Sequence, residues 1–253
     1  MRFKALTLFL SLFSALFMGE SFSGTIRHDV EDKKYLDYGK KHTCVFKLGG
    51  IVEENGEEVK YHGSCTAVSK RWVVTAAHVV KVEGLKRIFL FVGEKEVPIE
   101  KVILSPEFKG SFGSTDLALC RISEDLDLTR YPELYEGSDE LGKICGISGC
   151  GRTGNGITGA NLDSDKKRAG SNKVEAVSDG ALYCNMSRHG PTELEFLISH
   201  GDSGGGLFID GKLAGVNSSV LSKDGKTDSN YGDESCHTRI SKHREWIKKI
   251  ISD

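Results

Sequence analysis

Residues that together could activate a serine occur in this chain, each in a distinctive local sequence. Ser203 lies in SHGDSGGGLF, with glycines on both sides and Asp202 directly before it. Glycine lets the backbone turn tightly and approach a bound ligand closely. A serine becomes a good nucleophile only when a base removes its proton, and that base needs a carboxylate to hold its tautomer and balance its charge. The chain must therefore also supply a histidine and an aspartate.

Both residues are present upstream of the serine. VVTAAHVV places His78 just after an apolar run, and STDLALCRI places Asp116 at the start of another. GDSGG also fits G-x-S-x-G, the nucleophile elbow of esterases and lipases, which needs a helix after the serine and the histidine last in the chain. Here two apolar runs around Asp210 and Gly211 follow the serine and predict a hairpin, so the esterase is the weaker alternative.

The elements that must position these residues are mostly strands. After the first 23 residues, short β-branched or aromatic runs alternate with glycine and charged residues, a pattern typical of sandwiches and barrels. The apolar residues of SKHREWIKKIIS, residues 241–252, have helical spacing and predict an amphipathic terminal helix. The acid-rich segment 124–142 lacks alternation and is interpreted as a connection between two halves.

The N-terminal segment has the pattern of a secretory signal peptide. It contains Arg2 and Lys4, then an apolar run over residues 5–18, then small residues up to Ser23. The run is too short to span a bilayer. We expect a secreted or periplasmic protein that loses residues 1–23 and has no membrane association afterwards.

Composition restricts the partners. The formal net charge of −2 becomes −3 when the signal peptide is removed, which gives no electrostatic basis for binding nucleic acid. Seven cysteines are present without C-x-x-C spacing, so a zinc site is not expected. We expect no metal, no cofactor and a monomer. The odd number of cysteines leaves at least one free thiol or an intermolecular bond.

VVTAAH, DLAL and GDSGG, in this order, resemble the trypsin/chymotrypsin family of serine endopeptidases, and VILSPEF, ISGCGRTG and GKLAGVNSS extend the resemblance over most of the chain. The resemblance implies an all-β fold of two packed six-stranded antiparallel β-barrels with a C-terminal α-helix and the active site in the cleft between the barrels. It assigns residues 26–123 to the first barrel, 124–142 to the connection, 143–240 to the second barrel and 241–253 to the helix.

The same resemblance implies hydrolysis of a polypeptide substrate through an acyl-enzyme. Ser203 would be the nucleophile, His78 the general base and then acid, and Asp116 the orienting carboxylate. The N–H groups of Gly201 and Ser203 would form the oxyanion hole. Ser218 matches the family serine that supports the buried aspartate and begins the substrate-binding strand. The main alternative is a catalytically silent binding protein, but such homologues usually lack one of the three residues.

Asp202 matches the family aspartate that pairs with a freed N-terminal ammonium. The best match to that terminus is Ile26 in TIRHDV. Signal cleavage after Ser23 leaves Gly24 and Thr25 in front of it. Either these two residues form a short propeptide that a second cleavage removes, or the first cleavage occurs directly after Thr25. If a chain beginning at Gly24 is fully active, Asp202 must be satisfied in another way.

The resemblance also assigns a specificity pocket. Leu197 occupies the position where trypsin-like members carry the aspartate that binds lysine or arginine, so cleavage after basic residues is disfavoured. Val220 and Ser235 match pocket-wall positions, and the valine indicates a shallow pocket for small aliphatic residues. His237 could read an acidic side chain or be a locally bonded strand histidine. His200, at the pocket entrance, could touch substrate or face solvent.

The cysteine pattern departs from the family. Only Cys145 and Cys184 fall at family cysteine positions, and their usual partners are absent, since Ile209 is one of the residues that replace cysteines. No disulfide connectivity is predicted.

Overall fold

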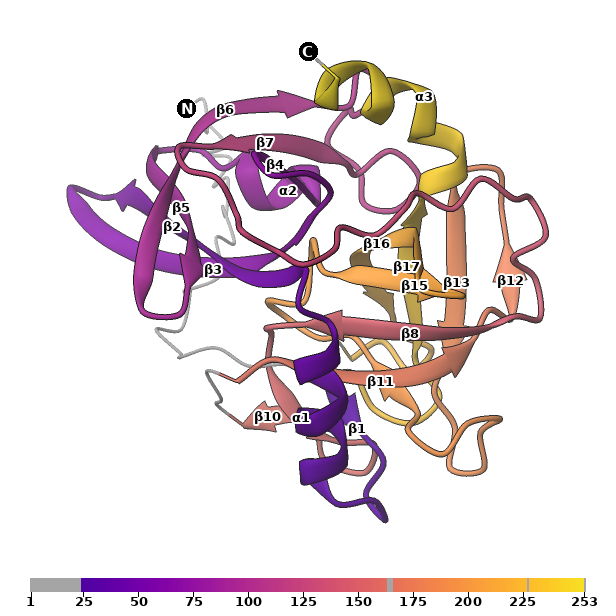
Figure 1. The fold of residues 1–253 in the computed structure, drawn as a ribbon. Coiled ribbons are helices and arrows are strands. Elements are labelled where there is room, and N and C mark those ends of the chain that lie inside the picture. Colours follow the sequence, from indigo (N-terminus) through magenta and orange to yellow (C-terminus); the bar gives the residue numbers. More distant parts are fainter. Residues whose placement is uncertain (1–23, 163–165, 227, 253) are drawn as a thin grey trace, which may run out of the picture.

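The computed structural model describes residues 24–162, 166–226 and 228–252, and Figure 1 shows their ribbon. The expected signal peptide, residues 1–23, lies outside the described residues.

The first half of the chain folds into a closed antiparallel barrel. Its strands follow the order β2-β3-β4-β7-β6-β5, and the short helix α2 (Ala77–Val80) comes directly after β4. The strands are β2 (Val45–Glu54), β3 (Glu57–Ala67), β4 (Trp72–Thr75), β5 (Leu85–Val92), β6 (Lys95–Leu104) and β7 (Ala118–Ile122).

The second half is a curved, seven-stranded antiparallel sheet. Its order is β11-β8-β15-β16-β17-β13-β12. The strands are β8 (Ile144–Gly149), β11 (Arg168–Lys173), β12 (Ala176–Val177), β13 (Ala181–Asn185), β15 (Gly206–Ile209), β16 (Lys212–Leu221) and β17 (Glu234–Arg239). Asp210 and Gly211, with φ of 51° and 76°, form the predicted hairpin turn between β15 and β16. A strand therefore follows the Ser203 segment, which argues against the esterase elbow.

A smaller sheet holds the N-terminal residues against the second half. Its order is β10-β9-β1-β14, with β10 (Gly159–Leu162), β9 (Thr153–Asn155), β1 (Thr25–Ile26) and β14 (Phe196–Leu197). The all-β fold of two packed units is confirmed, and the second unit differs from a simple closed barrel because its edge strands β11 and β12 do not pair. One end of that unit is instead completed by β1, which lies between β9 and β14.

The segment before β2 packs on the second half, although the sequence prediction placed residues 26–123 in the first barrel. Helix α1 (Asp32–Lys41) lies on β11, as Figure 1 shows. The Arg168 guanidinium bonds both carboxylate oxygens of Asp32, at 2.5 and 2.8 Å, and the buried Tyr35 hydroxyl donates to the carbonyl of Glu195. These contacts correct the predicted boundary.

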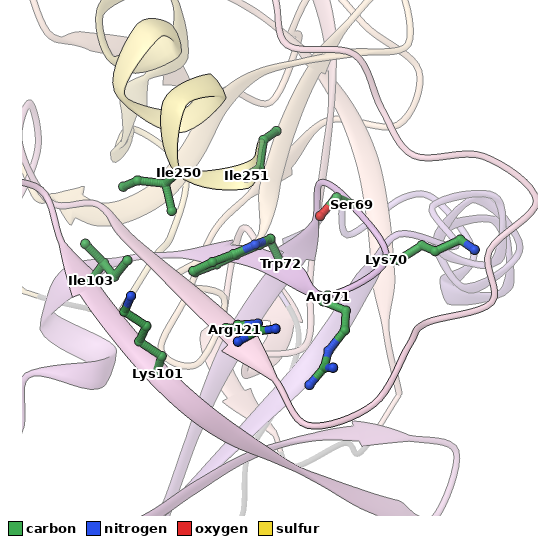
Figure 2. A pocket seen from close by; sticks show the side chains of 9 residues that line it. All are labelled: Ser69, Lys70, Arg71, Trp72, Lys101, Ile103, Arg121, Ile250 and Ile251. Atoms are coloured by element: carbon green, nitrogen blue, oxygen red, sulfur yellow. The ribbon is translucent and has the colours of Figure 1, made fainter. Parts of the chain in front are cut away.

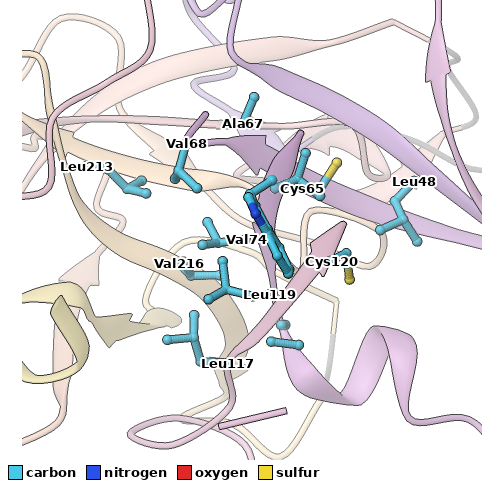
Figure 3. Packing of buried hydrophobic residues seen from close by; sticks show 14 of the residues in the cluster. Leu48, Cys65, Ala67, Val68, Val74, Leu117, Leu119, Cys120, Leu213 and Val216 are labelled. Atoms are coloured by element: carbon cyan, nitrogen blue, oxygen red, sulfur yellow. The ribbon is translucent and has the colours of Figure 1, made fainter. Parts of the chain in front are cut away.

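The larger core joins the two halves. Figure 3 shows Val74 and Leu119 of the barrel beside Val216 of β16, and Leu213 of the same strand belongs to this core as well. The predicted terminal helix is confirmed as α3 (Ile240–Ile251), whose buried face belongs to the same core. The relative placement of the halves is therefore fixed by apolar burial.

We predict that Leu119→Ala destabilises the fold by about 2–5 kcal/mol, because it leaves a cavity at a fully buried position. The matched control Leu221→Ala changes a leucine that is 45% exposed and should cost no more than about 0.5 kcal/mol. Urea unfolding at equilibrium measures both. Equal losses would show that the Leu119 side chain is not packed in this core.

Candidate active site

His78 and Asp116 meet at the ends of two paired strands. β4 and β7 are in register at Thr75 and Ala118, so His78 follows the end of one strand and Asp116 precedes the start of the other. His78 Nδ1 lies 2.6 Å from Asp116 Oδ2, and the His78 backbone N–H donates to Asp116 Oδ1 at 2.9 Å. Asp116 is fully buried. A carboxylate on Nδ1 selects the tautomer with the proton on Nδ1, which leaves Nε2 to act as a base.

A third polar side chain completes the surroundings of the buried carboxylate. Ser218, from β16 in the other half, donates through its hydroxyl to Asp116 Oδ2 at 2.6 Å and accepts from the Gly113 N–H at 2.8 Å. Asp116 therefore accepts three hydrogen bonds, which fix the position of its carboxylate between the two halves. The structure gives Ser218 the supporting contact expected from the sequence.

Ser203 lies in the turn that leads into β15 and is only partly buried. Its hydroxyl donates to the Ser218 carbonyl at 3.3 Å, a long bond that holds the side chain weakly. Its own carbonyl accepts from the Ser64 N–H of β3 at 2.8 Å. The structure thus joins His78 and Asp116 directly and links Ser203 to them through Ser218.

The turn around Ser203 offers backbone donors to a ligand. The N–H groups of Asp202, Gly204 and Gly205 each donate to a carbonyl oxygen of the chain. For the N–H groups of Gly201 and Ser203, we find no acceptor within the part of the chain that the structure describes. Two unpaired donors so close in sequence are suited to one oxygen that carries negative charge.

The buried carboxylate of Asp202 fixes this turn. Its Oδ2 accepts from the N–H groups of Gly24 and Ser199, both at 2.8 Å, and its Oδ1 accepts from the Gly151 N–H at 2.8 Å. Burial raises the pKa of Asp202 to about 7, although these three hydrogen bonds act in the opposite direction. The carboxylate is thus held in an environment that one further positive charge would make favourable.

In the uncleaved chain the nitrogen on Asp202 belongs to Gly24, and the pairing of a freed Ile26 terminus with Asp202 stays a prediction. Ile26 lies in β1, opposite Phe196 on one side and Asn155 on the other. The pairing of Thr25 and Ile26 in this sheet puts the preceding residue at Asp202. Gly24 has φ of 54°, and a Cβ there would lie 1.8 Å from the Phe196 ring, so only glycine fits.

Three residues assigned to the specificity pocket are fully buried. Leu197 lies in β14 opposite Thr25, and Ser235 and His237 lie in β17. His237 Nδ1 lies 2.9 Å from Asn217 Oδ1, and its Nε2 lies 2.9 Å from Ser235 Oγ. Burial lowers the pKa of His237 to about 3, so the ring is neutral at pH 7. These contacts favour the interpretation of His237 as a locally bonded strand histidine.

The other two pocket candidates are nearer the surface. Val220 is partly buried beside Ser235 in the β16–β17 ladder, and His200 is exposed just before the Ser203 turn. Of the residues assigned to substrate binding, Val220 and His200 are the ones that solvent reaches. Solvent also reaches Ser203 itself.

Two residues near the site were not predicted. Asn217 is fully buried, its side-chain amide donates to the Asp202 carbonyl at 3.1 Å, and its carbonyl accepts from Gly204 N–H. An asparagine within the apolar run LAGVNSSV was the available signal, since a buried amide needs partners. Phe112 is 62% exposed and packs edge-on against His78, with ring centroids 4.8 Å apart. No sequence signal separates it from other loop aromatics.

A groove of about 470 Å³ lies away from these residues, between the barrel and α3 (Figure 2). It is lined by Ser69, Lys70, Arg71, Trp72, Lys101, Ile103, Arg121, Ile250 and Ile251. A search of the described residues finds no group of three or more histidine, cysteine, aspartate or glutamate side chains that could hold a metal ion. None of the helices in that part of the chain is long and apolar enough to cross a membrane.

The closed barrel supplies the histidine–aspartate pair, and the second β unit supplies the glycine-flanked serine. The chain belongs to the Trypsin family, whose model matches residues 51–247.

Curated relatives agree with this assignment, and a solved structure has the same fold. The chain is 28% identical over 215 residues to chymotrypsin-like elastase family member 1 of Macaca fascicularis, covering 74% of this chain and 77% of that protein. It is 26% identical over 202 residues to trypsin-3 of Salmo salar, covering 73% and 81%. The structure of neuropsin, a serine protease expressed in the limbic system of mouse brain, superposes with a TM-score of 0.61 at 21% identity, covering 83% of this chain and 96% of that one.

We predict that Gly204→Ala destabilises the fold by about 1–3 kcal/mol more than Gly211→Ala. Both glycines have positive φ, but a Cβ on Gly204 would lie 2.0 Å from the Ser64 carbonyl oxygen, whereas a Cβ on Gly211 meets nothing within 4 Å. Thermal and urea unfolding of the two variants give the comparison. Equal destabilisation would mean that the Ser203 turn does not press against β3.

Proposed function

We propose that this protein is a secreted serine endopeptidase with Ser203 as nucleophile, His78 as general base and acid, and Asp116 as orienting carboxylate. The observation that carries the proposal is the pair of hydrogen bonds, 2.6 and 2.9 Å, by which the buried Asp116 holds the ring and backbone of His78. Membership of the Trypsin family supports peptide bonds as the substrate. The alternative is a silent binding protein, which the first experiment below distinguishes.

The proposed reaction assigns one role to each of these residues. His78 Nε2 takes the Ser203 proton as Oγ attacks the peptide carbonyl carbon, and the N–H groups of Gly201 and Ser203 donate to the resulting oxyanion. The imidazolium then gives its proton to the leaving amine, which leaves an acyl-enzyme. Water attacks the acyl group by the same route and releases Ser203. Asp116 holds the His78 ring through Nδ1 and stabilises the imidazolium.

The proposed specificity excludes basic residues and favours small aliphatic ones. Leu197 offers no carboxylate to a lysine or arginine side chain, and its own side chain is buried. Val220, partly buried opposite Ser235 in the β16–β17 ladder, would form one wall of the specificity pocket and make that pocket narrower. A substrate side chain there meets an apolar surface, which rewards a small apolar group.

We also propose that removal of the signal peptide after Ser23 completes the active site. The Gly24 nitrogen already lies 2.8 Å from Asp202 Oδ2. Cleavage of the peptide bond between Ser23 and Gly24 would therefore place a free ammonium on the buried carboxylate. The opposite charge would keep Asp202 ionised and hold the turn that carries the oxyanion donors. No second cleavage after Thr25 is needed, because a terminus at Ile26 would lack the residue that makes the contact.

Ser203→Ala should abolish peptide cleavage, by at least about 10³-fold, because the nucleophile is lost while the fold is not affected. The matched control is Ser138→Ala, an exposed serine in the connection between the halves, which should retain the activity of the unaltered protein. Cleavage of an alanine-containing peptide substrate is followed for each, with circular dichroism as the test of folding. Retained turnover in a folded Ser203→Ala protein would eliminate the proposed mechanism. An unaltered protein that folds but cleaves nothing would favour the silent binding protein.

The ammonium on Gly24 should change how stability depends on pH. In a chain that begins at Ser21, the pKa of Asp202 is raised from 3.8 to about 7, so its stabilising contribution is present below pH 3.8 and is lost as the pH rises toward 7. In a chain that begins at Gly24, the ammonium lowers that pKa from about 7, so less of the contribution is lost as the pH rises.

The melting temperatures of these two chains should therefore diverge between pH 4 and pH 7, with the Gly24 chain the more stable. Differential scanning calorimetry across this range measures the difference, and other titrating groups cancel because both chains contain them. A difference that does not vary with pH would contradict the pairing of Gly24 with Asp202.

A further inference from the structure

Two cysteines from non-adjacent strands meet inside the second half. Cys145 in β8 and Cys184 in β13 have their Sγ atoms 3.8 Å apart, and the two residues are 2% and 0% exposed. In the seven-stranded sheet, β15, β16 and β17 lie between these strands. The curvature of the sheet therefore brings β8 and β13 close together at the two cysteines, although no strand hydrogen bonds join these two strands.

The backbone near the two thiols is already held together by a side chain. Asn172 of β11 is the ladder partner of Cys145, and its amide donates to the carbonyl of Asn185, the residue after Cys184, at 2.9 Å. Sulfur atoms in a disulfide are about 2.05 Å apart. Rotation of the two side chains about Cα–Cβ would have to bring the Sγ atoms from 3.8 Å to that distance.

We propose that Cys145 and Cys184 form a disulfide that closes the second half across its open side. The bond would replace the family pairings that the chain lacks, since Ile209 occupies one of the absent partner positions. The five other cysteines would stay as thiols. The proposal rests on the secretion included in the proposed function, because disulfides persist in oxidising compartments.

The chemistry needs an oxidant of the disulfide class, such as oxidised glutathione. One cysteine thiolate attacks the oxidant and forms a mixed disulfide with release of one glutathione thiolate, and the second cysteine thiolate then displaces the other. Two protons and two electrons leave the protein, and one glutathione disulfide becomes two thiols. The hydrogen bond with Cys145 and burial raise the pKa of the Cys184 thiol well above its ordinary value, so the exchange must occur during folding, before burial.

Such a bond would constrain the unfolded chain by joining two cysteines that are 39 residues apart in sequence. It would also anchor β8, the strand that leads to Gly151 and hence to Asp202. The expected consequence is a more stable second half with an unchanged Ser203 turn.

The test uses the chain that begins at Gly24 and carries Ser203→Ala, which prevents self-cleavage, refolded in a glutathione redox buffer. The protein is then denatured and alkylated without reduction, and its intact mass is measured by mass spectrometry. We expect five alkyl groups, a linked peptide pair containing Cys145 and Cys184, and seven alkyl groups after reduction. A Cys44→Ser version should lose one alkyl group and keep the linked pair.

Stability provides the second measurement. Reductant should lower the melting temperature of the refolded protein by roughly 5–15 °C and leave that of the Cys145→Ser/Cys184→Ser double variant unchanged. Seven alkyl groups on correctly folded, unreduced protein, or a linked pair of other cysteines, would overturn the proposal. The same labelling on protein collected after export gives the result if refolding fails. Because the Ser203→Ala chain lacks the proposed catalytic serine, neither outcome depends on whether the native chain is a peptidase.

Discussion

The buried carboxylate of Asp202 is the constraint that organises this molecule. A carboxylate without solvent exposure is costly unless hydrogen bonds or an opposite charge compensate it. Here the N–H groups of Gly24, Ser199 and Gly151 converge on it from the N-terminal segment, the Ser203 segment and the loop after β8. Three parts of the chain that are far apart in sequence are thereby tied to one point, and the position of Ser203 follows from it.

A second buried carboxylate ties the two halves of the site together. Asp116 comes from the barrel and accepts from His78 of the same half and from Ser218 of the other. The carbonyl of Ser218 in turn accepts from the Ser203 hydroxyl. Groups that are proposed to react therefore come from both halves, and the shared apolar core keeps the halves in register.

Local sequence was sufficient where an interaction is local or a motif is specific. The hairpin at Asp210, the terminal helix and the contact of His78 with Asp116 could be predicted in this way. Helix α1 was missed because its ten residues are largely charged, so its packing on β11 depends on Tyr35 and on the pairing of Asp32 with Arg168. Gly24 was missed because the two-residue offset from Ile26 arises from strand pairing with distant partners. The burial of Leu197 has the same origin.

The most direct measurement is the intact mass of the exported protein before and after reaction with a fluorophosphonate, followed by peptide mapping of the label. We expect one label per chain, located on Ser203, on chains whose first residue is Gly24. Folded chains that begin at Gly24 and take no label, or that take it on another residue, would contradict the proposed active site. Label confined to chains that begin at Ile26 would contradict the role given to the Gly24 nitrogen.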